Sequence, residues 1–428
     1  MDASAFNPPR GMRDFYPEDM RSRNRLFTVW RDVAEQHGFA PYDACVVESL
    51  ELLKRKSGEE IVDQIYTFTD KSGRDLALRP EMTPSLARMV VARQGALTLP
   101  IKWYAIAQCF RYERMSKGRK REHYQWNLDI LGSADISAEV ELLATALDAL
   151  NRLGLGPDQV RVHYSSRALL SELLNHLGID QPHHAATFLA LDKLGKVDAA
   201  EIRTLLQAES LTPDAIDRVF ELIALTTLDE VQARLGNTSP AIQSLRRFEE
   251  LLGVYGLEKQ VRFDLSIVRG LSYYTGIVFE CFDVQRQFRA LFGGGRYDNL
   301  LTDLGGKPAS GVGLGFGDVV VAELLATLPA RSDHQSPPAL ALGYMTENER
   351  IPAMRIADAF RRQQVGADLG LQPEKAKAFF ARAGAGHFTH AVYLGPDDIQ
   401  TGQIRIKRLK DRAEMVRPVS NPASEPLE

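Results

Sequence analysis

The chain has 428 residues, of which 44% are hydrophobic and 25% are charged, and its formal net charge is −4. This composition is close to the globular average, so it excludes disordered, collagen-like and coiled-coil proteins, and the length predicts two or three domains. The slightly negative charge excludes a positive field over the whole molecule. Any nucleic acid would therefore have to bind a local basic surface.

Three cysteines, Cys45, Cys109 and Cys281, are too far apart in the sequence for a zinc site or a disulfide framework, so we expect buried thiols in a reducing compartment. No stretch of about 18 apolar residues predicts a membrane span, and the first twenty residues lack the apolar core of a secretory signal. The sequence therefore predicts a cytoplasmic protein without membrane contact.

The first predicted elements are a helix and an antiparallel sheet. Apolar residues recur at helical spacing over residues 18–37, and a strand is predicted over 39–47. Residues 59–131 alternate β-forming residues with turns rich in glycine and charge, which is typical of antiparallel strands. A second amphipathic helix is predicted over 138–153.

The second half of the sequence alternates between helical and strand patterns. Leu- and Ala-rich helical segments fill about 165–256, which indicates a helical insertion, and strand patterns return over 261–316. The polar stretch 331–338 ends in two prolines and is typical of an exposed linker. Over 339–428 strands and helices alternate, which predicts a small α/β domain with a mixed sheet.

The densest charge cluster is the segment 110–132, where a predicted hairpin tip carries six basic residues. Arginines at the end of a strand can bind a phosphate or a carboxylate bidentately, and the loop could close over a polyanion. A solvated hairpin turn explains the same charges. The six residues are Arg111, Arg114, Lys117, Arg119, Lys120 and Arg121.

Polar residues alternate with apolar ones in the strand after this loop, so Gln125, Asn127 and Asp129 should share one face of the sheet. The segment LRPEMTPS offers Glu81 and Thr83 in the same alternation, which predicts carboxylates on two separate strands. A merely solvent-exposed polar face is the alternative.

A third cluster lies in the segment 267–280 and the glycine-rich stretch after it. Tyr273 and Tyr274 are predicted to face opposite sides of their strand, with core packing as the alternative role. The glycines at 293–295 allow the backbone to approach a ligand, and Arg296 follows them directly.

Together these segments resemble those of a class II aminoacyl-tRNA synthetase, and specifically the histidyl-tRNA synthetase family. The FRYER strand with its basic loop is similar to class II motif 2. LRPEMT and RGLSYYTGIVFE resemble the histidine-binding segments of the family, and PRGMRDFYP and GGGRYDNL also match. The resemblance spans residues 8 to about 415.

The resemblance implies an α+β fold. Residues 1–330 would form the class II catalytic domain, an antiparallel sheet with flanking helices and the helical insertion at about 165–256. Residues 331–338 would be the linker, and 339–428 an α/β domain of the anticodon-binding kind. The family also implies a homodimer formed through residues 18–48.

The resemblance implies a histidine–tRNA ligase, which activates L-histidine with ATP and transfers it to tRNA(His). Arg111 and Arg269 would be catalytic and would hold the α-phosphate and the carboxylate, with Mg²⁺ on the pyrophosphate. Further histidine-binding residues would be Glu81, Met82, Thr83, Gln125, Asp129, Tyr273 and Tyr274. Further ATP-binding residues would be Glu113, Arg119, Arg121 and Arg296. No metal ligand from the protein is expected.

The sequence departs from the family pattern at three places. Met82 stands where many members have glycine, Ser272 stands where they have aspartate, and Val319 and Val320 replace the Glu-Arg that usually ends motif 3. These changes keep two alternatives open: a silent paralogue that senses histidine as a regulatory subunit of ATP phosphoribosyltransferase, and an RNA-binding regulator without chemistry.

Basic residues also gather in the C-terminal part, at Arg405, Lys407, Arg408, Lys410 and Arg412. This cluster is a candidate RNA-facing patch, and a charged strand edge that keeps the protein soluble is the alternative.

Overall fold

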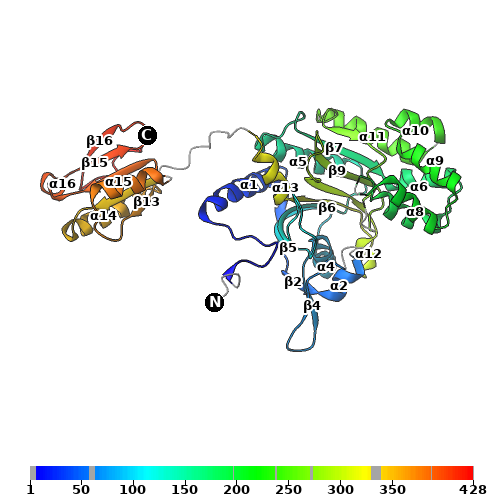
Figure 1. Cartoon of the computed structure of the whole chain (residues 1–428), viewed down its shortest axis with the longest axis horizontal. Coiled ribbons are helices and arrows are strands. Elements are labelled where there is room, and N and C mark those ends of the chain that lie inside the picture. The colour runs from blue at the N-terminus through cyan, green and yellow to red at the C-terminus, as the bar shows by residue number, and fades with distance from the viewer. Residues whose placement is uncertain are drawn as a thin grey trace. The chain divides into compact units, whose positions relative to one another are not determined.

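The computed structural model describes residues 6–56, 63–195, 197–236, 239–269, 273–328, 339–386 and 388–427. It separates into two compact units, Met1–Leu328 and Pro329–Glu428 (Figure 1). The predicted linker 331–338 and Ser272 lie outside the described residues. Within the described ranges, no helix is both long and apolar enough to cross a bilayer.

The first unit is built on an eight-stranded sheet of the described residues, with strand order β1-β5-β6-β11-β10-β9-β7-β8. The six strands from β5 to β7 in this order are antiparallel to their neighbours, and β1 and β8 each add a parallel strand at one edge. The strands are β1 (Ala40–Pro41), β5 (Ile101–Phe110), β6 (Glu122–Leu131), β7 (Val160–Ser166), β8 (Val261–Phe263), β9 (Ile277–Asp283), β10 (Phe292–Tyr297) and β11 (Gly311–Gly317). The predicted antiparallel sheet is confirmed.

Two predictions for the N-terminal strands were wrong in detail. The strand expected over 39–47 is limited to β1 and to the separate β2 (Val47–Ser49). The chain between them makes isolated backbone hydrogen bonds, from the Tyr42 amide to Tyr104 and from the Arg79 amide to Val46, and no continuous ladder. The strands expected within 59–131 do not all join one sheet. β3 (Thr67–Thr69) and β4 (Asp75–Leu78) pair with β2 in a small three-stranded antiparallel sheet.

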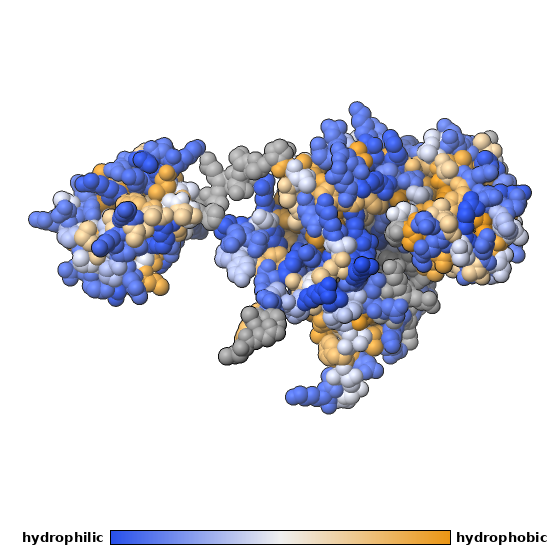
Figure 2. Space-filling view, in the orientation of Figure 1, coloured by the Kyte–Doolittle hydropathy of each residue, from blue (hydrophilic) through white to orange (hydrophobic). Residues whose placement is uncertain are grey.

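Helices α1 (Pro17–Gln36), α5 (Ser137–Leu153) and α13 (Asp318–Leu325) cover one face of the large sheet. The main core lies between them, where the fully buried rings of Trp30 and Trp126 stack at 5.7 Å and Phe316 packs against both. Hydrophilic residues cover most of the surface visible in Figure 2, as expected when apolar side chains are buried in this core. Cys109 and Cys281 are buried as expected, whereas Cys45 is exposed.

The predicted helical insertion consists of helices that leave the sheet at the end of β7 and return at β8 (Figure 1). They are α6 (Arg167–His176), α7 (His184–Leu191), α8 (Ala199–Ala208), α9 (Pro213–Ile223), α10 (Leu228–Leu235) and α11 (Pro240–Val254). Five of them begin with a Ser, Thr or Asp side chain that accepts a hydrogen bond from the first turn, at Ser166, Asp198, Thr212, Thr227 and Ser239. The strand β7 itself was not predicted.

The second unit has a five-stranded mixed sheet of order β13-β12-β14-β15-β16, in which the first pairs are parallel and the last antiparallel. The mixed sheet is therefore confirmed. Its strands are β12 (Ala339–Tyr344), β13 (Gly366–Leu369), β14 (His390–Leu394), β15 (Gln403–Arg408) and β16 (Glu414–Pro418). Its helices are α14 (Arg350–Arg362), α15 (Ala376–Ala385) and α16 (Pro396–Thr401).

A buried ion pair ties α5 to the sheet. The guanidinium of Arg296 on β10 donates to both carboxylate oxygens of Glu139, from Nε at 2.5 Å and from Nη2. Its Nη1 and Nη2 also donate to the carbonyls of Ser133 and Asp135, at 2.9 and 3.2 Å. The Glu139 side chain is 1% exposed, so a charge left alone here would be buried without a partner.

Arg296→Met should therefore lower the free energy of unfolding of the first unit by about 3–5 kcal/mol, the usual cost of removing one partner of a buried pair. Urea unfolding followed by circular dichroism measures this loss. The double variant Arg296→Met/Glu139→Leu should lose less than Arg296→Met alone, because no buried charge remains. Arg218→Met is the control: its pair with Asp214 on α9 is exposed, so its loss should stay within about 0.5 kcal/mol.

Candidate active site

The face of the sheet opposite α1, α5 and α13 carries the polar residues predicted on β6. Gln125, Asn127 and Asp129 lie on this face, which we call the site face, and they pair across β6 with β5 and β11. The neighbouring positions are Trp103, Ala105 and Ala107 on β5 and Gly313, Gly315 and Gly317 on β11. Except for Trp103 beside Asp129, these residues are small, so the floor of the site over β11 carries no side chains of its own.

The glycines of this floor are required for space. A Cβ at Gly313 would collide with Oδ1 of Asp129, and one at Gly315 would collide with the side-chain amide of Gln125. The two polar side chains therefore lie flat over β11 instead of standing upright. Any larger residue in these positions would displace them.

The structure places the LRPEMT segment beside the floor, although not as a strand. β4 ends at Leu78, and Thr83 is the first residue of helix α4 (Thr83–Arg93), so Glu81 and Thr83 come from a turn and a helix start. The expectation of a shared strand alternation was wrong because Pro80 and Pro84 favour a turn and a helix start here. Glu81, Met82 and Thr83 are nevertheless buried.

Tyr273 and Tyr274 also reach the site face, but outside a strand, because β9 begins only at Ile277. Their rings contact each other with centroids 4.9 Å apart, so the prediction that they face opposite sides was wrong. The Tyr273 hydroxyl donates to Glu81 at 3.4 Å. Tyr297 on β10, which the sequence analysis missed, stands at 85° to Tyr273 with centroids 6.0 Å apart.

Asp129 is the electrostatic centre of this pocket. Burial raises its pKa to about 7, while the Tyr297 hydroxyl, which donates to Oδ1 at 2.5 Å, favours the carboxylate, and the negative charge of Glu81 disfavours it. Burial also raises the pKa of Tyr273 and Tyr297, so both remain neutral hydrogen-bond donors.

Three polar atoms in or beside this pocket are buried without a hydrogen-bond partner among the described residues: Oδ2 of Asp129, Oδ1 of Asn127 and the hydroxyl of Tyr42. Buried polar groups in proteins are normally paired, because an unpaired group loses its hydration without compensation. Oδ1 of Asn127, and Oδ2 of Asp129 when this group is ionised, accept hydrogen bonds only, so the pocket is then complementary to a ligand that donates them.

Arg269 enters the site from the segment before the tyrosines. Its Nη1 donates to Glu280 on β9 at 2.8 Å, and its guanidinium lies 5.8 Å from the ring centroid of Tyr274. A Cβ at Gly293 would collide with Nη1, so this guanidinium also depends on a bare position in β10. Glu280 was missed as a site residue, although it is the last residue of the segment RGLSYYTGIVFE.

The basic loop between β5 and β6 supplies the remaining predicted residues. Arg111, directly after β5, donates from Nε to the carbonyl of Pro80 at 3.0 Å, which joins it to the Glu81 turn. Arg119 forms an ion pair with Glu113, and the Arg121 guanidinium lies 3.8 Å from the ring centroid of Tyr112. The loop also contacts α13, because the Gly118 amide donates to Glu323 at 3.1 Å.

Arg296 and Val320 are not brought to the site. Along β10, Gly293, Gly295 and Tyr297 lie on the site face, so Arg296 points to the opposite face, where Glu139 holds it. We therefore withdraw the expectation that Arg296 contacts ATP. Val320 belongs to the main core, is 6% exposed and has its Cγ2 near Gly118.

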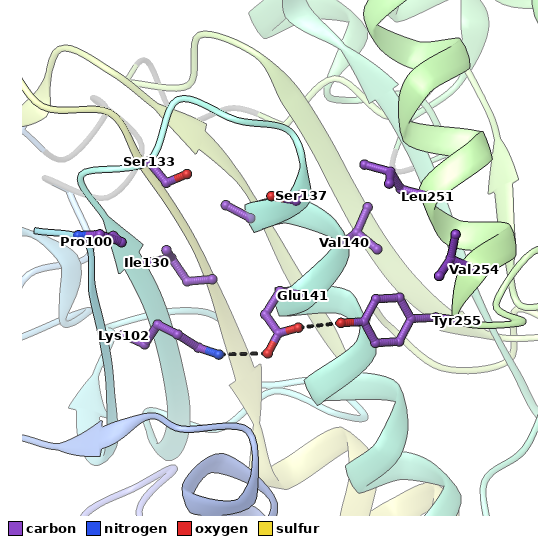
Figure 3. Close-up of a pocket in the computed structure, with 11 residues that line it drawn as sticks. Pro100, Lys102, Ile130, Ser133, Ser137, Val140, Glu141, Leu251, Val254 and Tyr255 are labelled. Carbon is purple, nitrogen blue, oxygen red and sulfur yellow. Dashed lines mark hydrogen bonds and ion pairs between the residues drawn. The ribbon is translucent and has the colours of Figure 1, made fainter.

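A cavity of about 290 Å³ also lies away from the site (Figure 3). Lys102 on β5 and Glu141 on α5 line it and pair at 2.7 Å, and the Tyr255 hydroxyl donates to Glu141 at 2.8 Å. Lys102 and Ile130 point away from the site face, so this cavity is separate from the polar pocket over β6.

Comparison with known proteins identifies the family of this fold and site. A model of the family described as histidyl-tRNA synthetase matches residues 11–317. The chain is 40% identical over 406 residues to the chloroplastic/mitochondrial histidine–tRNA ligase of Arabidopsis thaliana, covering 94% of this chain and 83% of that protein.

Solved structures show the same fold. The crystal structure of histidyl-tRNA synthetase from Nostoc sp. aligns with a TM-score of 0.80 at 20% identity over 97% of both chains. That of an ATP phosphoribosyltransferase regulatory subunit/histidyl-tRNA synthetase from Bacillus halodurans aligns at 0.75 and 22%, over 91% of this chain and 98% of that one. On the family model and the 40% identity, this chain belongs to the histidyl-tRNA synthetase family.

Proposed function

We propose that this chain is a histidine–tRNA ligase, which forms histidyl-adenylate and pyrophosphate from L-histidine and ATP and transfers histidine to the 3′ end of tRNA(His). The observation that carries the proposal is the arrangement on the site face, where an acidic and polar pocket adjoins the guanidinium of Arg269. The charges of an amino acid are complementary to this arrangement: its cationic amino group suits the acidic pocket, and its anionic carboxylate suits the guanidinium.

The unpartnered acceptors of the pocket would receive the amino group and the imidazole. Glu81, Thr83, Gln125 and Asp129 would surround the amino group, and Tyr273 and Tyr274 would wall the imidazole. An amino acid other than histidine, whose side chain does not hydrogen-bond at the positions of the imidazole nitrogens, would leave buried polar groups of the pocket unpaired. This penalty discriminates strongly between histidine and other amino acids.

Arg111 and Arg269 would supply the charge stabilisation for activation. The histidine carboxylate attacks the α-phosphorus of ATP, and a mixed-anhydride bond forms between a carboxylate oxygen and that phosphorus. The bond from the α-phosphorus to the bridging oxygen breaks, so pyrophosphate leaves. The attack brings two anions together, so two fixed guanidinium groups lower their repulsion and stabilise the five-coordinate transition state. Positioning of the two reactants supplies much of the remaining rate.

The loop residues Glu113, Arg119 and Arg121 would contact ATP or the acceptor end of the tRNA. Mg²⁺ would accompany ATP on its phosphates, and no protein side chain is assigned to it. We also propose a cytoplasmic homodimer formed through α1 and β1, which is supported by the position of β1 at the edge of the large sheet. The C-terminal unit would bind tRNA, with the basic side chains of and after β15 as its candidate surface.

A histidine-sensing regulatory subunit remains the competing function, because Val319 and Val320 replace the usual motif 3 pair. Arg269 favours the ligase, since a sensor does not need a guanidinium fixed for a developing phosphate charge. Histidine-dependent ATP–pyrophosphate exchange on the purified protein separates the two functions: a ligase catalyses it and a sensor does not.

Arg269→Ala should lower the rate of this exchange by at least about 10³-fold while the protein stays folded, because it removes a charge needed mainly in the transition state. Arg269→Lys should also be slow, since an ammonium group does not reproduce a planar fork. The matched control is Arg286→Ala, an arginine whose guanidinium lies over Phe282 on β9, the strand that also carries Glu280. Exchange near the wild-type rate in Arg269→Ala would contradict the assigned role.

The pH dependence should report Asp129. If its carboxylate receives the amino group, kcat/KM for histidine falls as the pH drops below about 7, where Asp129 becomes protonated. Tyr297→Phe removes a hydrogen bond that favours the carboxylate, so it should raise the pKa of Asp129 and move the inflection to higher pH.

Histidine itself titrates in this range, but identically with every variant, so only the shift between enzymes is informative. Tyr104→Phe serves as the control, because that hydroxyl donates to Glu35 on the opposite face of the sheet. An unchanged inflection in Tyr297→Phe would show that Asp129 does not control histidine binding.

A further inference from the structure

The junction between β7 and α6 holds the segment that carries Arg269. The Ser165 hydroxyl donates to the carbonyl of Ile267, and the Arg167 amide donates to the carbonyl of Gly276 at 2.9 Å. Between these two contacts, Nη2 of Arg167 donates to the carbonyl of Arg269 at 2.5 Å. The start of the insertion therefore contacts this segment at both ends and at the proposed catalytic arginine itself.

Arg269 has a backbone conformation that depends on such support. Its φ is +57°, in the left-handed region that residues with a Cβ adopt only at an energetic cost. A charged donor on its carbonyl forms a strong hydrogen bond that fixes the orientation of this peptide. Because Glu280 holds the guanidinium, Arg269 is held at both its main chain and its side chain.

The insertion in turn holds Arg167. Its guanidinium lies over the ring of Phe188 on α7, 4.7 Å from the centroid. Asp192, directly after α7, attracts the positive charges of both Arg167 and Arg269. Burial lowers the pKa of Arg167 to about 10, so the side chain stays charged at neutral pH.

We propose that Arg167 is a positioning residue for Arg269, through which the first two helices of the insertion set the rate of histidine activation. Arg167 contacts the main chain of Arg269, and we assign it no contact with histidine or ATP. The inference rests on the proposed function, because it takes the activation step as the reaction that Arg269 serves. It gives the insertion a part in the first half-reaction, before any tRNA is bound.

The test compares Arg167→Gln and Arg167→Lys in ATP–pyrophosphate exchange. Glutamine is too short and uncharged to replace the donor, so kcat should fall about 30-fold, in line with the losses that small displacements of catalytic groups cause. Lysine keeps a charged donor of similar reach, so its kcat should stay within about fivefold of the wild type. Arg203→Gln is the matched control: Arg203 lies on α8, stacks over Phe220 at 4.6 Å and pairs with Asp217, without contact to Arg269.

A double-mutant cycle separates positioning from general support of the fold. In the Arg269→Ala background no guanidinium remains to be positioned, so adding Arg167→Gln should slow adenylate formation by less than about threefold. Single-turnover measurements with excess enzyme keep these slow rates observable. A further 30-fold loss in that background would overturn the proposal, as would a kcat of Arg167→Gln within twofold of the wild type.

If Arg167→Gln does not fold, Phe188→Leu replaces it in the same cycle. Leucine keeps α7 packed and removes the ring under the guanidinium, so a loss of about fivefold is expected, which should disappear in the Arg269→Ala background. An unchanged rate, or an equal loss in both backgrounds, would overturn the proposal. A wild-type enzyme without any exchange would instead contradict the proposed function, so the two failures are distinguishable.

Discussion

The site depends on the absence of side chains from the middle of one sheet face. Asp129, Gln125 and Arg269 all lie over glycine positions of β10 and β11, and each would collide with a Cβ there. The same two strands must bury large residues on their other face, where Phe292 and Phe316 pack in the core. On β11, strict alternation of glycine with Val312, Leu314 and Phe316 satisfies both demands, because successive residues of a strand point to opposite faces.

The glycines of this alternation cost conformational entropy on folding, and burial of the apolar residues between them offsets that cost. Glycine loses more conformational freedom on folding than any other residue, so a strand such as GVGLGFG is intrinsically weak. Here it is the fourth strand of an eight-stranded sheet, paired on both sides and covered by α5. Burial of Val312, Leu314 and Phe316 therefore holds a strand that could not persist at an edge.

The charges of the site are arranged before any ligand binds. Glu280 fixes the guanidinium of Arg269, and Tyr297 fixes the carboxylate of Asp129, so the proposed reaction would need little reorganisation of these groups. A second network on the other face, between Arg296 and Glu139, stabilises the same strand without taking part in the site. β10 therefore supports one arginine on each face. On the site face Arg269 lies over Gly293, and on the core face Arg296 pairs with Glu139.

Sequence patterns predicted features within a single strand or helix, and they missed contacts between segments that are distant in the sequence. Period-two alternation placed Gln125, Asn127 and Asp129 on one face, because all three belong to one strand. The same rule, applied along β10 from Gly293 to Tyr297, would have put Arg296 on the opposite face. The rule could not predict that Glu81 lies beside β6. The position of a turn relative to a strand depends on tertiary packing, which no local sequence pattern shows.

The contact between the Arg167 side chain and the Arg269 carbonyl shows the limit most clearly, because the two residues are 102 positions apart in the sequence and no local pattern links them. Topology brings them together. The insertion leaves the sheet at the end of β7 and returns at β8, which pairs with β7 in parallel, and the Arg269 segment follows β8 directly. Both ends of the insertion are therefore fixed beside the site. Because no flexible loop lies between α6 and this contact, a displacement of α6 would also move the donor to the carbonyl of Arg269. An insertion anchored in this way belongs to the structure that holds Arg269, the proposed catalytic arginine.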